Sequence, residues 1–283
     1  MLARRVMVVL AVGCIGVASA SRAEPVAQAA PDYAAALERI VSLQRQVKDL
    51  HPAFSKAYPV AVVTDKTFYV YEHDAASGRY RLVKTAPDTM NIPTGIRAAM
   101  PLPFWDNRVA CVVTPEAFDD LRGQVLVLHE FVHCYQWETC EMRLKEQMSL
   151  FRRAMARKDY MWELQHPFPY TQQAFSEAYG AMLADFGANA AALTGHRKRL
   201  KGVLSADDWD YMTWQEWKEG LARYLENQVN ARLDQRPNAG GQKTPYSRVT
   251  FYFGGEALVR ALASREPGIE KDVERLYRAI AEK

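Results

Sequence analysis

One apolar run, residues 125–136, constrains the rest of the chain, because it contains His129-Glu130-x-x-His133. The run has no Gly or Pro, so it predicts a buried helix. Residues four apart lie on the same face of a helix, about 6 Å apart along its axis, so both imidazoles can face one metal ion. Glu130 lies one step round the helix, where it can reach a ligand of that metal without binding the metal itself.

The alternative is a pair of core histidines with an accidental spacing. Two imidazoles and a carboxylate buried beside Leu128 and Phe131 would each cost about 1–3 kcal/mol if they had no polar partners. A metal ion removes that cost. The pattern therefore predicts a zinc site with His129 and His133 as ligands and Glu130 as the general base of a hydrolase.

Length and composition are those of an ordinary folded protein. The chain has 283 residues, of which 49% are hydrophobic and 24% charged, enough for one domain or two closely packed ones. The formal charge is only +3, and no run of consecutive Lys and Arg is longer than three residues. This balance argues against nucleic acid as a partner.

Residues 1–23 have the pattern of a secretory signal peptide. Arg4 and Arg5 precede an apolar stretch, and A-x-A-like cleavage sites end at Ala20 and Ala23. Cleavage after Ala20 would remove two of the arginines that make up the charge of +3 and leave +1, whereas cleavage after Ala23 would leave zero. The apolar stretch is too short to cross a membrane, and no later segment is long enough, so no membrane span is expected in the mature chain.

The leader predicts a periplasmic or secreted protein. A minor alternative is a lipoprotein anchored through Cys14, because Ala11-Val12-Gly13-Cys14 resembles a lipoprotein cleavage box. Three cysteines remain after cleavage, namely Cys111, Cys134 and Cys140. In an oxidising compartment one disulfide is expected, between Cys111 and one of the other two, with one thiol left over.

The first third of the mature chain mixes helix and strand signals. Residues 24–31 predict a flexible linker, and a helix is expected from its N-cap Asp32 to His51-Pro52. Proline-rich residues 87–103 predict a loop, and residues 74–78 a hairpin turn. Four runs rich in β-branched and aromatic residues predict strands: 60–63, 68–71, 80–83 and 108–113.

The rest of the chain is expected to be mainly helical. Thr114 as N-cap and Pro115 at the first position predict a helix start, and Gly195 is one of the residues expected to interrupt the helices. Segments with helical periodicity are 116–137, 140–160, 171–193, 206–234, 254–264 and 268–281. The predicted fold class is α+β within one domain, 32–283: an α/β part, 32–113, packed on a helical part, 114–283.

A catalytic zinc with two histidines needs a third protein ligand and one open position. No histidine follows His133 at the spacing of a third imidazole ligand, so a carboxylate is expected. Glu177 and Glu219 both lie in helix-like segments and compete for this role. The other four histidines lie near polar or Pro/Gly segments and are expected at the surface: His51, His73, His166 and His196.

The stretch Glu219-Gly220-Leu221-Ala222-x-Tyr224-x-Glu226 resembles the second motif of the gluzincin metallopeptidases, particularly the zinc aminopeptidases. The resemblance implies a zincin-like fold in which Glu219 completes the metal site. Gly220 beside the ligand agrees, since glycine permits close approach of helix backbones. Glu226, two turns on, is a candidate to hold a ligand histidine from behind. No Gly-x-Met-Glu-Asn-like motif precedes the helix, so aminopeptidase activity does not follow.

A hydrolase of this type benefits from a donor aimed at the developing oxyanion. Tyr252 is the candidate, because Tyr252-Phe253-Gly254-Gly255 is similar to the Tyr-x-Lys-Gly stretch of zinc aminopeptidases. The alternative is that Tyr252 packs in the core between two phenylalanines. Tyr246 and Arg248 are further candidates.

Together these features predict a secreted zinc metallopeptidase that hydrolyses a peptide or protein substrate through a zinc-bound water activated by Glu130. Two alternatives stay open. One is a zincin-like binding protein with a structural metal or none, and the other is a zinc hydrolase of a non-peptide amide or ester.

Overall fold

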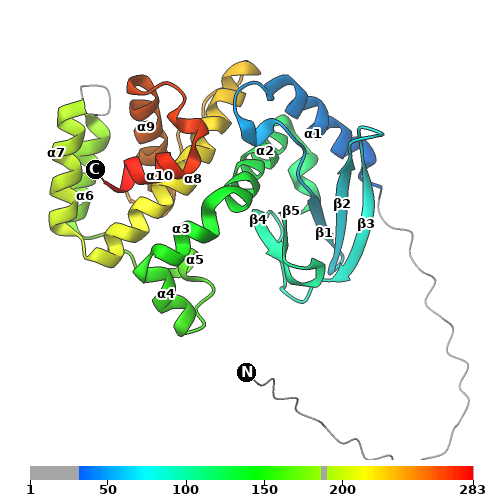
Figure 1. Cartoon of the computed structure of the whole chain (residues 1–283), viewed down its shortest axis with the longest axis horizontal. Coiled ribbons are helices and arrows are strands. Elements are labelled where there is room, and N and C mark those ends of the chain that lie inside the picture. Colours follow the sequence, from blue (N-terminus) through cyan, green and yellow to red (C-terminus); the bar gives the residue numbers. More distant parts are fainter. Residues whose placement is uncertain (1–31, 186–189, 283) are drawn as a thin grey trace, which may run out of the picture. The chain divides into compact units, whose positions relative to one another are not determined.

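The computed structural model describes residues 32–185 and 190–282. The predicted signal peptide 1–23, the linker 24–31 and Cys14 lie outside the described residues. From Asp32 onward the chain makes one compact unit. Apart from one helix at residues 34–47, all its described α-helices follow the strands, as Figure 1 shows. The predicted α+β class is thereby confirmed.

A five-stranded sheet has the order β3-β2-β1-β5-β4, which leaves β3 and β4 at its edges. Neighbouring strands run antiparallel except β1 and β5, which are parallel. The four predicted strands are present, three of them longer than expected. The strands are β1 (Val60–Thr64), β2 (Thr67–Asp74), β3 (Arg79–Pro87), β4 (Arg97–Leu102) and β5 (Arg108–Val113).

Alternating side chains divide the strands between two apolar layers, as the two-residue period of a strand requires. Val60 and Val62 face the main core, which the helices complete. Ala61 and Val63 face a smaller cluster on the other side, closed by residues of the segment 92–104. The sheet is therefore covered on both faces, which explains why β1 is a continuous apolar run.

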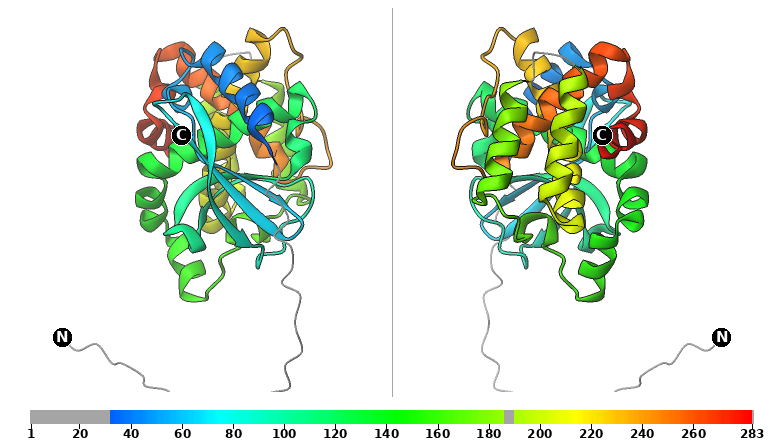
Figure 2. Two further views of the ribbon diagram at one scale, coloured as in Figure 1. Left: turned by 90° about the vertical axis from the view of Figure 1, so that its right-hand side faces the viewer. Right: turned by 90° about the vertical axis from the view of Figure 1, so that its left-hand side faces the viewer.

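The helices have unequal lengths, and α8 is the longest of those described, with 27 residues. The two views in Figure 2 show the sheet at one end of the unit and α6 and α7 at the other. The helices are α1 (Ala34–Val47), α2 (Leu121–Gln136), α3 (Met142–Gln147), α4 (Ser149–Ala156), α5 (Trp162–Gln165), α6 (Gln173–Ala184), α7 (Ala190–Val203), α8 (Ala206–Arg232), α9 (Val249–Arg265) and α10 (Val273–Ala281).

Short helical turns join these elements. A π-helical segment, η4 (Trp137–Glu141), continues α2. Four 3₁₀ turns lie elsewhere in the described chain: η1 (Pro52–Phe54), η2 (Pro103–Trp105), η3 (Pro115–Phe118) and η5 (Ile269–Lys271).

Several predicted boundaries are wrong, among them those of the predicted helix 140–160, which is divided at Met148 between α3 and α4. The segment 87–103 is not all loop, because it contains β4. Thr114 and Pro115 begin only the 3₁₀ turn η3, and α2 starts at Leu121, where the Asp120 side chain accepts a hydrogen bond from Gly123 N at 2.6 Å. Gly195 does not interrupt a helix, since α7 runs through it.

The predicted disulfide is also absent, because Cys111, Cys134 and Cys140 are free thiols. All three are buried in the main core, and burial raises the pKa of Cys111 and Cys134 well above the ordinary value. These thiols therefore pack as small apolar side chains.

The expectation that His51 lies at the surface is wrong, because its side chain is buried. Its Nε2 bonds the Glu270 carbonyl at 2.8 Å, and its Nδ1 accepts from Ala53 N at 3.0 Å. The other three histidines predicted at the surface are partly exposed. Within the described chain, no helix has the length and apolar character needed to cross a membrane.

Candidate metal centre

Helix α2 carries both histidines of the motif on one buried face. The ring centroids of His129 and His133 lie 4.9 Å apart, and both side chains and that of Glu130 are buried. His129, Glu130 and His133 each offer a ligand atom, and these atoms lie within 4.8 Å of one another. This buried group could hold a metal ion.

Glu219 on α8 lies opposite the two imidazoles, although 86 residues separate it from His133. Its Oε2 is 3.2 Å from His133 Nε2 and 3.6 Å from His129 Nε2. Glu177, the competing candidate, is exposed on α6 and accepts a hydrogen bond from Gln173 at 2.8 Å. Of the two carboxylates, the structure brings Glu219 to the histidines.

The close crossing of α8 and α9 places Glu219 at this depth. A Cβ atom on Gly220 would come within 2.4 Å of the Gly255 backbone, and one on Gly255 within 2.1 Å of Glu216 O. Both positions therefore require glycine. The sequence signal beside Glu219 thus has the packing role expected of it.

In each imidazole, the nitrogen that faces away from Glu219, Nδ1, has a hydrogen-bond acceptor. His129 Nδ1 donates to Glu226 Oε2 at 2.9 Å, and His133 Nδ1 donates to Gln136 Oε1 at 2.8 Å. The Gln136 amide is oriented by its own bond to the Lys218 carbonyl, at 3.3 Å. With the proton on Nδ1, each Nε2 keeps a lone pair for a metal ion.

Glu226 thus has the position expected of it, whereas the sequence predicted no role at the metal centre for Gln136. Glu226 is held by Arg223 Nε at 3.1 Å and by Asn238 Nδ2 at 2.8 Å. Although burial alone raises its pKa, the contacts with His129 and Arg223 lower the pKa of Glu226 to about 2. The carboxylate is therefore charged when it holds the imidazole.

The donor set fits a divalent cation. Burial lowers the pKa of His129, but its hydrogen bonds to Glu219 and Glu226 outweigh this effect and raise the pKa to about 10. The pKa of Glu219 lies well below its ordinary value despite burial, because His133 and His129 stabilise its charge. Two imidazoles and the Glu219 carboxylate thus converge in one buried place, and imidazole and carboxylate donors suit zinc.

Glu130 faces the sheet. Its Oε2 accepts a hydrogen bond from Ala99 N of the edge strand β4 at 2.8 Å. Since β5 pairs with the opposite side of β4, this N–H belongs to the unpaired edge. The unpaired edge of β4 therefore lies directly beside the Glu130 carboxylate.

Tyr252 on α9 lies beside the metal-centre histidines, so it is more than an aromatic side chain of the core. Its ring stacks on that of His129, with 6.2 Å between centroids and an interplanar angle of 16°. Burial raises the pKa of Tyr252 well above its ordinary value, and the negative charge of Glu219 raises it further. The phenol therefore stays protonated and can act as a hydrogen-bond donor.

Of the two other donor candidates, the structure brings only Arg248 close. Arg248 Nη1 lies 3.2 Å from Glu219 Oε1, and its guanidinium lies 5.4 Å from the Tyr252 ring centre. Tyr246 instead packs against Phe175 and Tyr179.

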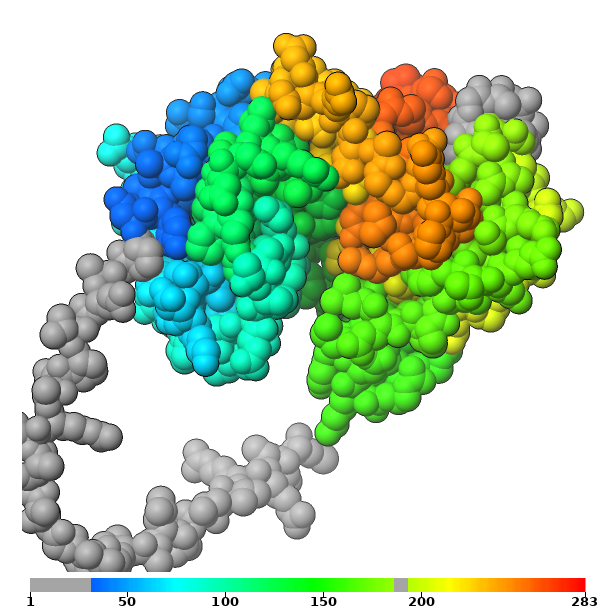
Figure 3. Space-filling view, turned by 180° about the vertical axis from the view of Figure 1, so that it is seen from behind, coloured from blue at the N-terminus to red at the C-terminus, as the bar shows by residue number. Residues whose placement is uncertain are grey.

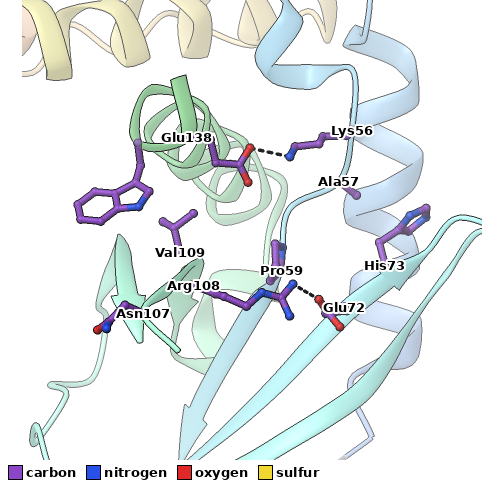
Figure 4. A pocket seen from close by; sticks show the side chains of 10 residues that line it. Lys56, Ala57, Pro59, Glu72, His73, Asn107, Arg108, Val109 and Glu138 are labelled. Carbon is purple, nitrogen blue, oxygen red and sulfur yellow. Dashed lines mark hydrogen bonds and ion pairs between the residues drawn. The ribbon is translucent and has the colours of Figure 1, made fainter. Parts of the chain in front are cut away.

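Figure 3 shows the surface hollowed between the teal atoms of the β4 region and the green and orange atoms of the helical half. A separate pocket of about 540 Å³ lies between the ends of β2 and β5 and the segment η4 (Figure 4). Two ion pairs border it, Lys56–Glu138 and Arg108–Glu72. Its cations are thus already neutralised, and none of the metal-centre residues lines it.

Comparisons with protein-family models, with curated proteins and with solved structures found no match to this chain. What the centre can do is therefore argued from its own residues.

Proposed function

We propose that this protein is a secreted zinc metallopeptidase of gluzincin type. The observation that carries the proposal is the convergence of His129 Nε2, His133 Nε2 and Glu219 Oε2, with Glu130 beside them. His129, His133 and Glu219 would hold the zinc. When bound, zinc supplies Lewis-acid chemistry, lowering the pKa of water to about 7 and polarising a carbonyl.

Glu130 is the general base in this proposal. It takes a proton from the attacking water and later gives it to the leaving amine. Tyr252, with its raised pKa, donates a hydrogen bond to the oxyanion that forms on the substrate carbonyl. Glu226 and Gln136 keep the imidazoles in the tautomer that leaves Nε2 free.

A peptide is favoured over other amides and esters by the edge strand β4. An extended peptide can pair with the unpaired edge of a sheet through main-chain hydrogen bonds. Ala99 N on that edge bonds Glu130, so a peptide lying along β4 would bring a backbone amide to the general base. Residues 1–23, with their signal-peptide pattern, support a periplasmic or secreted location.

The test is Glu130→Gln, which keeps the size of the side chain but removes its basicity. Zinc content should stay near one per chain, while cleavage of a peptide library should fall by about 10²–10⁴-fold. Full activity in Glu130→Gln would contradict the mechanism.

Metal content separates the enzyme from a binding protein. Zinc should be lost in His133→Ala and reduced in Glu219→Ala, with Glu177→Ala as the matched control that keeps it. A parent protein without zinc, measured after expression in zinc-supplemented medium, would favour the binding-protein alternative.

A further inference from the structure

Arg248 lies at the rim of the metal centre with hydrogen-bonding capacity to spare. Its Nη1 lies 3.2 Å from Glu219 Oε1 and 3.5 Å from Gln215 Oε1. Among residues 32–185 and 190–282, Nη2 and Nε of Arg248 have no acceptor. The Arg248 side chain is 31% exposed, against 11% for Glu219, so the guanidinium can be reached from solvent.

The Glu219 carboxylate lies between Arg248 and the two imidazoles and contacts both sides. Oε2 faces His133 and His129, and Oε1 faces Arg248. The Tyr252 ring contacts both sides, since it stacks on His129 and lies under the Arg248 guanidinium. A group bound by Arg248 would therefore lie within about one or two residues of the bond on which Glu130 acts, given the length of a peptide unit.

The other arginine of the centre is not available for a ligand. Arg223 donates to Glu226, to the Asn238 carbonyl and to the Gly240 carbonyl, and its side chain is only 6% exposed. Arg248 is thus the arginine of this pair that keeps free donors. A planar guanidinium with two free donors matches a carboxylate in a two-bond arrangement.

We propose that Arg248 is a specificity-determining residue that binds a substrate carboxylate next to the scissile amide. The inference rests on the proposed peptidase function. Two sources share this chemistry, the C-terminal carboxylate of a peptide cleaved near its end and the side chain of an internal Asp or Glu.

The experiment uses three peptides of otherwise identical sequence and the zinc-loaded protein. One ends in Phe with a free carboxylate, one ends in Phe amide, and one is the amide with Asp on the leaving side of the bond. The value of kcat/KM should be about 10- to 100-fold higher for a carboxylate-bearing peptide than for the neutral amide, the range for a hydrogen bond to a charged group. Which of the two is preferred identifies the source.

The decisive readout is the preference ratio and not the activity, because Arg248 also contacts Glu219. In Arg248→Gln the ratio should fall to near one, and Arg248→Lys should retain part of it. Arg260→Gln is the matched control, since Arg260 is an exposed arginine on α9, the helix that begins directly after Arg248, and is paired with Glu256. The same ratio should appear in peptide affinities measured by calorimetry on Glu130→Gln, with and without Arg248→Gln.

Equal kcat/KM for all three peptides, or an unchanged ratio in Arg248→Gln, would overturn the inference and leave the peptidase intact. If a zinc-containing protein cleaved no peptide at all, the proposed function would fall and the inference with it.

Discussion

Glu226 and Gln136 each accept the Nδ1 proton of a different histidine, so the two imidazoles are oriented from behind by unlike groups. Glu226 is charged, and replacing it with Gln removes that charge from a buried contact of 2.9 Å with His129. We expect Glu226→Gln to weaken zinc binding by about 10- to 100-fold. Competition with a chromophoric chelator measures this affinity.

The control is Glu256→Gln on α9, because Glu256 is also buried and hydrogen-bonded but its partners are Asn227 and Arg260. Zinc affinity should be unchanged there. Equal losses in both variants would mean that the general charge of the region, and not the contact with His129, sets the affinity.

His51 predicts a pH dependence of stability. Burial lowers its pKa from 6.5 to about 4. Between these values the unfolded ring binds a proton and the folded ring does not, so the contribution of His51 is complete above pH 6.5 and is lost as the pH falls toward 4. The loss amounts to about 3 kcal/mol, at about 1.4 kcal/mol per pKa unit.

Urea unfolding of the parent and of His51→Asn at several pH values tests this. The Asn side chain can still accept from Ala53 N but cannot titrate in this range. The stability difference between parent and variant should shrink as the pH falls from about 7 to about 4. A difference that stayed constant would show that the ring has the same pKa in the folded protein as in the unfolded chain.

The residues of the centre differ in how far the sequence alone could predict them. His129, Glu130 and His133 follow from a local spacing on one helix, whereas Glu219 was preferred to Glu177 because its segment resembles a gluzincin motif. Gln136 could have been found by the same helical spacing, because it lies three residues after His133. The contact between Ala99 and Glu130 depends on how a strand packs against a helix, which no spacing along the chain reveals.

At the scale of elements, the crossing of α8 and α9 is the most constrained contact. Gly220→Ala should force the two backbones apart and destabilise the protein by about 1–3 kcal/mol, as overpacking does. Zinc affinity should fall as well, because Glu219 is the next residue.

Gly195→Ala is the matched control, since Gly195 lies in α7 and a Cβ atom there would meet nothing within 4 Å. That change should instead stabilise by up to about 1 kcal/mol through helix propensity. Thermal unfolding shows whether each substitution lowers or raises the stability of the protein. Stabilisation by both substitutions would show that the crossing has room for a side chain.

Elements with strong local signals were predicted, and those fixed by tertiary contacts were not. Strand β5 follows from its run of β-branched residues, and its predicted bounds agree with the structure. Strand β4 contains a proline, as only an edge strand readily tolerates, so its sequence indicated a loop. The start of α2 was placed too early because Thr114-Pro115 is an equally good start for a 3₁₀ turn.

At the scale of the whole molecule, the proposed ligands join α2, which packs on the sheet, to α8 in the helical half. Zinc that binds only the folded form should stabilise it by about 4 kcal/mol at a thousand times its Kd. For a chain of this size the melting temperature should rise by roughly 10 °C.

Calorimetry before and after removal of zinc with a chelator measures this shift. His133→Ala should melt at one temperature in both conditions. If the parent also did not respond to the chelator, the two helices would not be joined by a metal.

The two edges of the sheet also differ in their risk of self-association. Exposed Arg79, Arg81 and Lys84 line the β3 edge, and such charges oppose pairing with a second copy of the chain. The β4 edge has no such row of charges, and it borders the hollow in which a peptide substrate would pair. An edge left open for a substrate strand is also open to a strand of a second copy of the chain. The proposed activity would thus carry a risk of self-association that the β3 edge does not have.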